Sequence, residues 1–225
     1  MGQVTIQEFT TKNPITMIGY EAGVCWGADT SDAEKNYKRG LECLAANHGR
    51  TFEFPDVYMI LDGYSARVIR EWYTHIGGLP TRLQASTRYI DYTNNGLKVV
   101  IPKTIKNEED IELFNRAINK IIWTASQLES HGIPREDIAL LLPLGMETKI
   151  TCKHNLRNLI DMSHQRMCTR AYWEYREMFK DICDALSAYS EEWAYLVKYY
   201  FKPKCDVVGF CTEKYCCGRK SKKTT

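Results

Sequence analysis

The sequence has little that would direct it to a membrane, a secretory pathway or a nucleic acid. No apolar run approaches the roughly 18 residues that a transmembrane helix needs. The first residues, MGQVTIQEFTTKNP, lack the basic and then apolar pattern of a signal peptide. The net charge of the 225 residues is only +2, so the composition does not indicate nucleic-acid binding. We therefore expect a cytoplasmic protein with no membrane and no nucleic-acid partner.

Common catalytic signatures are also missing. The sequence has no GxGxxG or GxxxxGK[ST] phosphate loop, no HExxH zinc motif and no GxSxG nucleophile motif. The histidines are isolated from one another, and a lone histidine is more often structural than catalytic. An active site in this chain must therefore be assembled from separate segments.

The sequence also lacks the paired CxxC spacing of zinc knuckles, although it has 9 cysteines. Five of them are scattered, and we expect these to be buried free thiols: Cys25, Cys43, Cys152, Cys168 and Cys183. The others gather in CDVVGFCTEKYCC, as Cys205, Cys211, Cys216 and Cys217. These four could hold zinc, but neighbouring cysteines rarely both ligate one ion. We favour free or redox-active thiols and assign no metal.

The hydrophobic pattern predicts one α+β domain, with a small, mostly antiparallel sheet packed by long helices. We find no repeat and no linker, and we expect the basic GRKSKK segment to be disordered. The domain is expected to cover residues 1–203, with a Cys-rich tail over 204–225. Helices are predicted at 32–49, 64–77, 107–134 and 154–201, the last broken near 168–170; strands are predicted at 54–63, 97–102 and 137–145.

Polar donors are concentrated in HIGGLPTRLQASTRY, residues 75–89. Two glycines and a proline end the preceding helix, and no acidic residue occurs from Ile76 to Ile90. The donors that follow are Thr81, Arg82, Gln84, Ser86, Thr87 and Arg88. Such a loop suits a phosphate. The alternative, a solvated basic loop, is the more common outcome for an isolated run of this kind.

A second polar cluster lies in KHNLRNLIDMSHQRMCTRAYWEYRE. Asn155 and Arg166 are eleven residues apart, about three helical turns, so they should share one helix face. That polar face could bind a ligand or simply be solvated. Arg157 and Asp161 have the spacing of a surface ion pair.

Several segments, taken in order, resemble the flavin-dependent thymidylate synthases from about Gly23 to about Phe201. They are ANHGRTFEF, REWYTHIGGLPTRLQASTRY, GIPREDIALLLPL, TCKHNLRNL and QRMCTRAYWEYRE. The second resembles the family signature of Arg-His-Arg followed by Ser-x-Arg-Tyr. The fourth resembles the Asn-x-Arg-x-Leu motif. Each match alone is weak, whereas their order and spacing are specific.

The chain departs from the family pattern at several positions. Arg-His-Arg is replaced by Thr74-His75-Ile76, and Gly77-Gly78 lengthens the loop that follows. The arginine before Leu-Pro is Ala139, and an asparagine of the flavin-contacting helix is Asp161. Arg82 and Arg135 are available to replace some of the lost charge. These changes put the substrate in question.

The resemblance implies reductive methylation of dUMP to dTMP. Methylenetetrahydrofolate would supply the carbon, reduced FAD the hydride, and NADPH the electrons that regenerate it. It also implies a homotetramer with active sites at subunit interfaces. Arg166 would be catalytic, stabilising negative charge on the uracil ring.

By the same resemblance, Ser86, Arg88 and the backbone from Gln84 onward would hold the nucleotide phosphate. The nucleotide site is expected to comprise Glu71, Thr74, Arg82, Gln84, Ala85, Ser86, Thr87, Arg88 and Arg166. The FAD site is expected to comprise His48, Arg50, Thr74, His75, Ile76, Asn155, Leu156, Arg157 and Asp161.

Two other functions stay open at this point. A related enzyme could methylate or hydroxymethylate a different pyrimidine nucleotide, which the lost arginines would explain. Alternatively, the protein could bind a nucleotide or flavin without catalysis. Product analysis distinguishes the first alternative, and a flavin absorption spectrum distinguishes the second.

Overall fold

The computed structural model describes residues 2–223. The strands are β1 (Gln3–Ile6), β2 (Asp56–Ser65), β3 (Thr81–Gln84) and β4 (Glu147–Asn155). The helices are α1 (Pro14–Trp26), α2 (Ala33–Ala45), η1 (Gly49–Glu53), α3 (Ala66–Trp72), α4 (Glu108–Ser130), α5 (Arg135–Ile138), η2 (Ala139–Leu141), α6 (Leu156–Arg166), α7 (Trp173–Tyr189), α8 (Glu191–Tyr200) and α9 (Lys204–Val208).

The strands form one four-stranded sheet in the order β1-β2-β4-β3. Alternation of buried and more exposed side chains along β2 matches the predicted strand, with Val57, Met59 and Leu61 fully buried. The expected α+β class with a small antiparallel sheet is confirmed. Two compact units make up the fold: residues 2–3, 61–73 and 83–150 form unit 1, and residues 4–60, 74–82 and 151–223 form unit 2.

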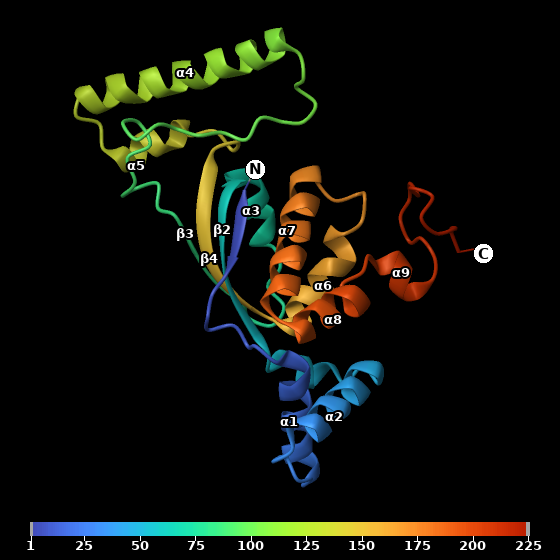
Figure 1. Ribbon diagram of the computed structural model, residues 1–225. Helices are drawn as coiled ribbons and strands as arrows, with labels where there is room; N and C mark the ends of the chain where they lie inside the picture. Colours follow the sequence, from blue (N-terminus) through green and yellow to red (C-terminus); the bar gives the residue numbers. More distant parts are fainter. Residues whose placement is uncertain (1, 224–225) are drawn as a thin grey trace. The chain divides into compact units, whose positions relative to one another are not determined.

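Unit 1 contains the long helix α4, which lies alongside the short α5 (Figure 1). The side chain of Asn107 accepts a hydrogen bond from the Asp110 amide at 2.7 Å and so forms the N-cap of α4. Three acidic residues in the first turn complement the positive end of the helix dipole. The core of this unit is built around Leu97, Ile118 and Met146.

Unit 2 gathers α6, α7 and α8 around large buried side chains, including Tyr175, Phe179 and Trp193. Glu192, at the start of α8, accepts hydrogen bonds from the Ile15 amide at 2.6 Å and the Thr16 amide at 3.0 Å. Those amides belong to the first turn of α1 and have no partner within their own helix. The carboxylate of α8 therefore caps α1.

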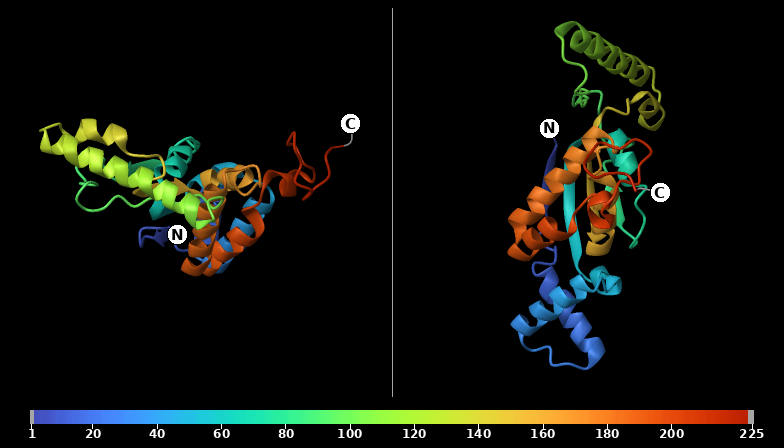
Figure 2. Two further views of the ribbon diagram at one scale, coloured as in Figure 1. Left: turned by 90° about the horizontal axis from the view of Figure 1, so that it is seen from above. Right: turned by 90° about the vertical axis from the view of Figure 1, so that its right-hand side faces the viewer.

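The helices α1 and α2 pack side by side in unit 2, as Figure 1 and the right-hand view of Figure 2 show. Glycines at the contact make this approach possible. A Cβ atom on Gly19 would lie 1.7 Å from the Asn36 carbonyl oxygen, and one on Gly40 would lie 2.0 Å from the Ile15 carbonyl oxygen. Neither helix could come this close with a larger residue at either position.

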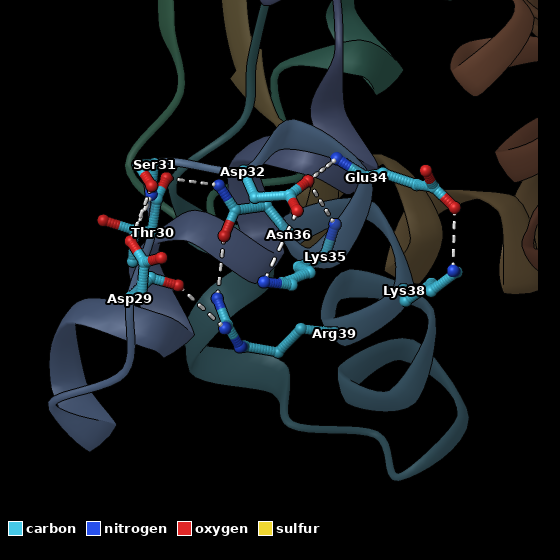
Figure 3. A network of polar contacts seen from close by, with 9 residues as sticks. All are labelled: Asp29, Thr30, Ser31, Asp32, Glu34, Lys35, Asn36, Lys38 and Arg39. Atoms are coloured by element: carbon cyan, nitrogen blue, oxygen red, sulfur yellow. Dashed lines mark hydrogen bonds and ion pairs between the residues drawn. The ribbon is translucent and has the colours of Figure 1, made fainter.

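A polar network holds the turn between these helices (Figure 3). Arg39 donates from Nη1 to the Gly19 carbonyl at 2.9 Å and to Asn36 Oδ1 at 2.8 Å. It also donates from Nη2 to the Asp29 carbonyl at 3.2 Å. Asp32 caps α2 by accepting from the amides of its first turn.

Several predicted elements are corrected by the structure. Residues 97–102 are not a strand, because only Val99 forms an isolated bridge, to Met146. Residues 137–145 are not a buried strand: they contain the end of α5 and η2, and the side chain of Leu140 is 88% exposed. A run of apolar residues does not by itself distinguish an exposed 3₁₀ turn from a strand.

Several predicted helix boundaries also differ from those in the structure. α2 ends at Ala45, and the left-handed Asn47 follows it, so Gly49 is not the stop. α3 ends at Trp72, before the predicted Gly77-Gly78. The helical stretch expected from His154 begins only at Leu156, because β4 continues to Asn155; its expected break falls between α6 and α7.

The basic segment 218–223 is not disordered as expected, since Lys222 pairs with Cys211 in an isolated parallel bridge. Within residues 2–223, every helix is too short or too polar to span a lipid bilayer.

Candidate functional site

The centre of the candidate site in unit 2 is a contact between the end of α6 and the loop that precedes β3. Arg166, the last residue of α6, donates from Nε to Nε2 of His75 at 2.8 Å. The Arg166 guanidinium also lies over the ring of Tyr175, with Cζ 4.4 Å from the ring centroid. Tyr175 is fully buried near the start of α7 and packs edge-on against the His75 ring. Together these contacts fix the plane of the guanidinium.

The hydrogen bond determines the protonation state of His75. An arginine Nε can only donate, so His75 Nε2 must carry a lone pair and the ring is neutral. Burial, followed by the positive charges of Arg166 and Arg82, lowers the pKa of His75 to about 4. The positive charge at this contact therefore stays on Arg166 at neutral pH.

Gly78 shapes the same loop. Gly78 has a left-handed backbone, with φ of 74°, and a Cβ there would lie 2.6 Å from the side-chain Nδ2 of Asn155. Asn155 Nδ2 donates to the Gly78 carbonyl at 3.3 Å. Arg82 donates from Nη2 to the His75 carbonyl. The loop is thus attached to β3 through Arg82 and to the start of α6 through Asn155.

Asn155 is the N-cap of α6 rather than a residue within it, which corrects the predicted helix face. Its Oδ1 accepts a hydrogen bond from the Asn158 backbone amide at 2.9 Å, while its Nδ2 donates to the Gly78 carbonyl of the loop. Asn155 and Arg166 nevertheless both contact the 75–78 loop. Beneath them, buried His154 and Asn158 share a 2.5 Å hydrogen bond between Nδ1 and Oδ1.

Three of the residues expected to bind FAD lie in a second region of unit 2, at η1 and the start of α6: His48, Arg50 and Arg157. Arg157 Nη1 donates to Glu53 Oε1 at 2.6 Å, so its partner is Glu53 and not the predicted Asp161. Gly49 packs against the Arg157 guanidinium, since a Cβ there would lie 3.6 Å from Cζ. His48 and Arg50 are exposed nearby in sequence, and the His48 ring is edge-on to Trp26.

The other residues predicted to contact FAD differ in burial. Leu156 is fully buried, and its amide donates to the Pro55 carbonyl at 2.9 Å. Thr74, Ile76 and Asp161 are exposed. The amides of Leu156 and Asn158, in the first turn of α6, already have partners, so an anion bound here would be held mainly by side chains.

Most of the predicted phosphate site lies in unit 1. The Ala85 amide donates to the Lys149 carbonyl at 2.7 Å, and Gln84 Nε2 donates to Thr148 Oγ1 at 3.3 Å. These bonds hold the segment beside β4. Ser86 Oγ accepts from the Arg88 amide at 3.1 Å, which forms a tight turn through Thr87.

Arg88 itself is exposed and pairs with Glu136, with 3.2 Å between Nε and Oε2. Arg135 pairs with Asp91 at 2.6 Å and with Glu129 at 3.0 Å, so it forms local ion pairs. Glu71 is partly buried on α3.

The predicted residues are therefore divided between the two units. Unit 1 contains Glu71, Gln84, Ala85, Ser86, Thr87 and Arg88; unit 2 contains His48, Arg50, Thr74, His75, Ile76, Arg82, Asn155, Leu156, Arg157, Asp161 and Arg166. Sequence reasoning missed Tyr175, His154, Asn158 and Glu136. Tyr175 lay in the quoted AYWEYRE segment, but its position gave no sign that it would contact Arg166.

The cysteines only partly match the expectation. Cys43, Cys152 and Cys183 are buried free thiols, as expected, whereas Cys25 is exposed and Cys168 is intermediate. Within residues 2–223, no three His, Cys, Asp or Glu side chains are placed to share a metal ion.

Comparison with known proteins gives a consistent result. The model of the Thy1 family, described as thymidylate synthase complementing protein, matches residues 8–189. The flavin-dependent thymidylate synthase of Pyrococcus furiosus is 27% identical, over 95% of this chain and 91% of that protein. The enzyme of Thermococcus onnurineus is 26% identical, over 90% of this chain and 86% of its own.

A similar fold occurs in the crystal structure of thymidylate synthase X from Helicobacter pylori with FAD and dUMP. The TM-score is 0.67, with 16% sequence identity, and the match covers 88% of this chain and 100% of that one. At this identity the likeness supports the fold alone.

Proposed function

The chain belongs to the Thy1 family of flavin-dependent thymidylate synthases, and we propose that Arg166, held by His75 and Tyr175, forms the catalytic centre at which it converts dUMP to dTMP. Methylenetetrahydrofolate supplies the carbon and NADPH the reducing equivalents. The observation that carries this assignment is the 2.8 Å hydrogen bond from Arg166 Nε to His75 Nε2.

Arg166 acts on the pyrimidine by stabilising negative charge. Ionisation on the N3 side of uracil makes C5 more nucleophilic, and a fixed guanidinium beside the ring favours that ionised form. His75 contributes by remaining neutral, because its pKa is lowered to about 4. Tyr175 and His75 together restrict rotation of the guanidinium, so less entropy is lost when the nucleotide binds.

The residues between η1 and α6 fit the anionic part of FAD. Arg157 lies against Gly49, and the exposed Arg50 and His48 belong to the same segment. Two guanidinium groups suit a diphosphate. When bound, reduced FAD would supply the hydride for the methylation, and NADPH would regenerate the reduced form. Asp161, which replaces an asparagine of the family pattern, places a carboxylate on the exposed face of α6.

The segment 84–88 is assigned to the nucleotide phosphate. The hydrogen bonds to Lys149 and Thr148 hold its backbone in place, and Ser86 and Arg88 supply a hydroxyl and a cation. Arg88 must exchange Glu136 for the phosphate, which costs little because both side chains are more than half exposed.

Arg82 is not only a replacement for the arginines that the family pattern has and this chain lacks. Its contact with the His75 carbonyl gives it a role in positioning the loop. We keep it in the nucleotide site as a hypothesis, together with Thr74 and Glu71. We also propose that residues 1–203 form the synthase domain, that 204–225 form its tail, and that active sites are completed at the subunit interfaces of a homotetramer.

Product analysis tests this function. The purified protein is incubated with FAD, NADPH, methylenetetrahydrofolate and dUMP. The nucleotides are then separated, and their masses are measured by mass spectrometry. We expect dTMP. A hydroxymethylated product, or turnover of another pyrimidine nucleotide but not dUMP, would replace the assignment with the related enzyme. Absence of both turnover and flavin binding would contradict it.

The role of Arg166 has its own test. Arg166→Lys keeps the charge but not the planar guanidinium, so turnover should fall more than dUMP affinity. Arg116→Lys, on the exposed face of α4, is the matched control. Turnover of Arg166→Lys close to that of the control would remove Arg166 from the mechanism.

A further inference from the structure

A pocket of about 420 Å³ lies in unit 2 at the end of α6, where the C-terminal tail packs against the chain. Residues 164–171 form one side, and residues between 203 and 220 form the other. α9, which begins at the lining residue Lys204, contacts α6 (Figure 1). The volume is in the range of small-molecule sites.

The lining of the pocket is strongly basic. Its cations are Arg166, Arg170, Lys204, Arg219 and Lys220, and Glu213 is the acidic residue among the lining side chains. Arg219 and Lys220 share Asp206, at 3.6 Å and 4.0 Å. Among residues 2–223, no carboxylate forms an ion pair with Arg170 or Lys204. The net charge of the lining therefore favours a ligand with several negative charges.

An aromatic wall accompanies these cations. Arg170 lies over the Tyr215 ring, with Cζ 5.5 Å from the centroid, and this contact links the α6–α7 connection to the tail. A guanidinium held on an aromatic face is partly oriented before a ligand arrives. The tail thus completes a pocket that residues 164–171 could not form alone.

We propose that this pocket binds the anionic end of a co-substrate, a flexible group carrying two or more carboxylates or phosphates. Arg166 belongs both to the pocket and to the proposed catalytic centre. A co-substrate held here would therefore extend from the tail toward the reacting nucleotide. Two co-substrates have this chemistry: folate with γ-glutamyl residues, and NADPH with its phosphates. The choice of a co-substrate rests on the proposed function, whereas binding of a polyanion does not.

The thiols of the pocket provide a readout that needs no turnover. Cys168, Cys205, Cys211 and Cys217 line it. A hydrogen bond from the Thr169 hydroxyl holds the pKa of the exposed Cys217 thiol below its usual value, so Cys217 should react readily with a neutral alkylating reagent. Exposed Cys25, on α1, is the internal control, because it lies outside the pocket.

The experiment is alkylation of the full chain with iodoacetamide, followed by peptide mass spectrometry that resolves Cys217 from Cys216. It is performed alone and with tripolyphosphate, tri-γ-glutamyl folate, monoglutamyl folate, NADPH or NADH. At ten times Kd, mass action leaves about one tenth of the sites open, so alkylation of Cys217 should slow about tenfold. Cys25 should be unaffected.

Protection by tri-γ-glutamyl folate but not by monoglutamyl folate assigns the glutamyl carboxylates, and protection by NADPH more than NADH assigns the additional phosphate. Protection by tripolyphosphate alone would overturn the co-substrate assignment, and no protection by any ligand would overturn the pocket itself. Because alkylation requires no reaction, a failure here is distinct from a failure to make dTMP.

Variants test the residues directly. Arg170→Gln and Lys204→Gln should each weaken protection by about tenfold in apparent affinity, since each removes a charged donor. Lys198→Gln, an exposed cation on α8 outside the pocket, is the matched control and should leave protection unchanged. Equal protection in all three variants would contradict the proposal.

Discussion

Acid should destabilise this protein through His154, a histidine buried beneath the candidate site. Its side chain is fully buried, and burial lowers its pKa to about 3. In the unfolded chain the pKa is about 6.5. Between pH 6.5 and 3 the unfolded state therefore binds a proton that the folded state does not. The free energy of unfolding must fall as the pH falls through this window, and it should not depend on His154 above it.

When the pKa of His154 in the folded state lies below the chosen pH, the loss of unfolding free energy depends only on how far that pH lies below the pKa in the unfolded state. At pH 5, which is 1.5 units below the unfolded pKa, the loss from His154 is about 2 kcal/mol. His75 acts in the same direction, because burial lowers its pKa to about 4. Its contribution is smaller than the shift implies, since the ring is only partly buried and solvent screens it.

The assay is urea denaturation at pH 7.5 and at pH 5, followed by tryptophan fluorescence. His154→Gln retains an N–H that can donate to Asn158 but cannot titrate, so its loss of stability between the two pH values should be about 2 kcal/mol smaller than that of the wild type. His131→Gln, at the exposed end of α4, is the control and should behave like the wild type. Equal pH dependence in His154→Gln and the wild type would refute the reasoning.

Other predictions follow from individual contacts. Gly40→Ala should lower the free energy of unfolding by about 1–3 kcal/mol despite the better helix propensity of alanine, because the new Cβ would lie 2.0 Å from the Ile15 carbonyl; an unchanged denaturation midpoint would contradict the close helix contact. Arg88→Ala should weaken dUMP binding by about 1.5–3 kcal/mol in calorimetry and leave uncharged deoxyuridine unaffected; equal loss for both ligands would remove Arg88 from the phosphate site. Glu136→Gln should strengthen dUMP binding up to about fivefold by releasing Arg88, and a weaker complex would contradict this competition. In a double-mutant cycle, Arg82 and Arg88 should be non-additive by more than about 0.5 kcal/mol if they share the phosphate, whereas strict additivity would leave Arg82 only its contact with the loop.

The parts of the fold that the sequence predicts well are those with independent local signals. α4 has an N-cap, an acidic first turn and a Gly-Pro end, and its predicted span agrees closely with Glu108–Ser130. β2 alternates between buried and more exposed side chains from Asp56 to Asp62. Residues 97–102 and 137–145 have only apolar character. Apolar side chains alone do not determine whether a segment pairs with a neighbouring strand. That pairing depends on residues distant in the sequence.

The candidate site shows the same limit. His75, Asn155 and Arg166 could be selected from the sequence, because motif order and residue type identified them. The contact of Arg166 with Tyr175 could not, since it depends on how α7 returns toward α6. Nor could the Glu136 partner of Arg88 or the pocket formed by the tail. Sequence patterns select residue types, whereas tertiary packing determines which of them meet.

The central claim is tested most directly by a single-turnover experiment under anaerobic conditions. The protein is loaded with FAD, reduced chemically, and mixed with dUMP and methylenetetrahydrofolate without NADPH. We expect the oxidised flavin spectrum to return as dTMP appears in equal amount, and we expect Arg166→Lys to show neither change while still binding dUMP. Oxidation of the flavin without dTMP, or formation of dTMP without a bound flavin, would contradict the assignment of this chain as a flavin-dependent thymidylate synthase.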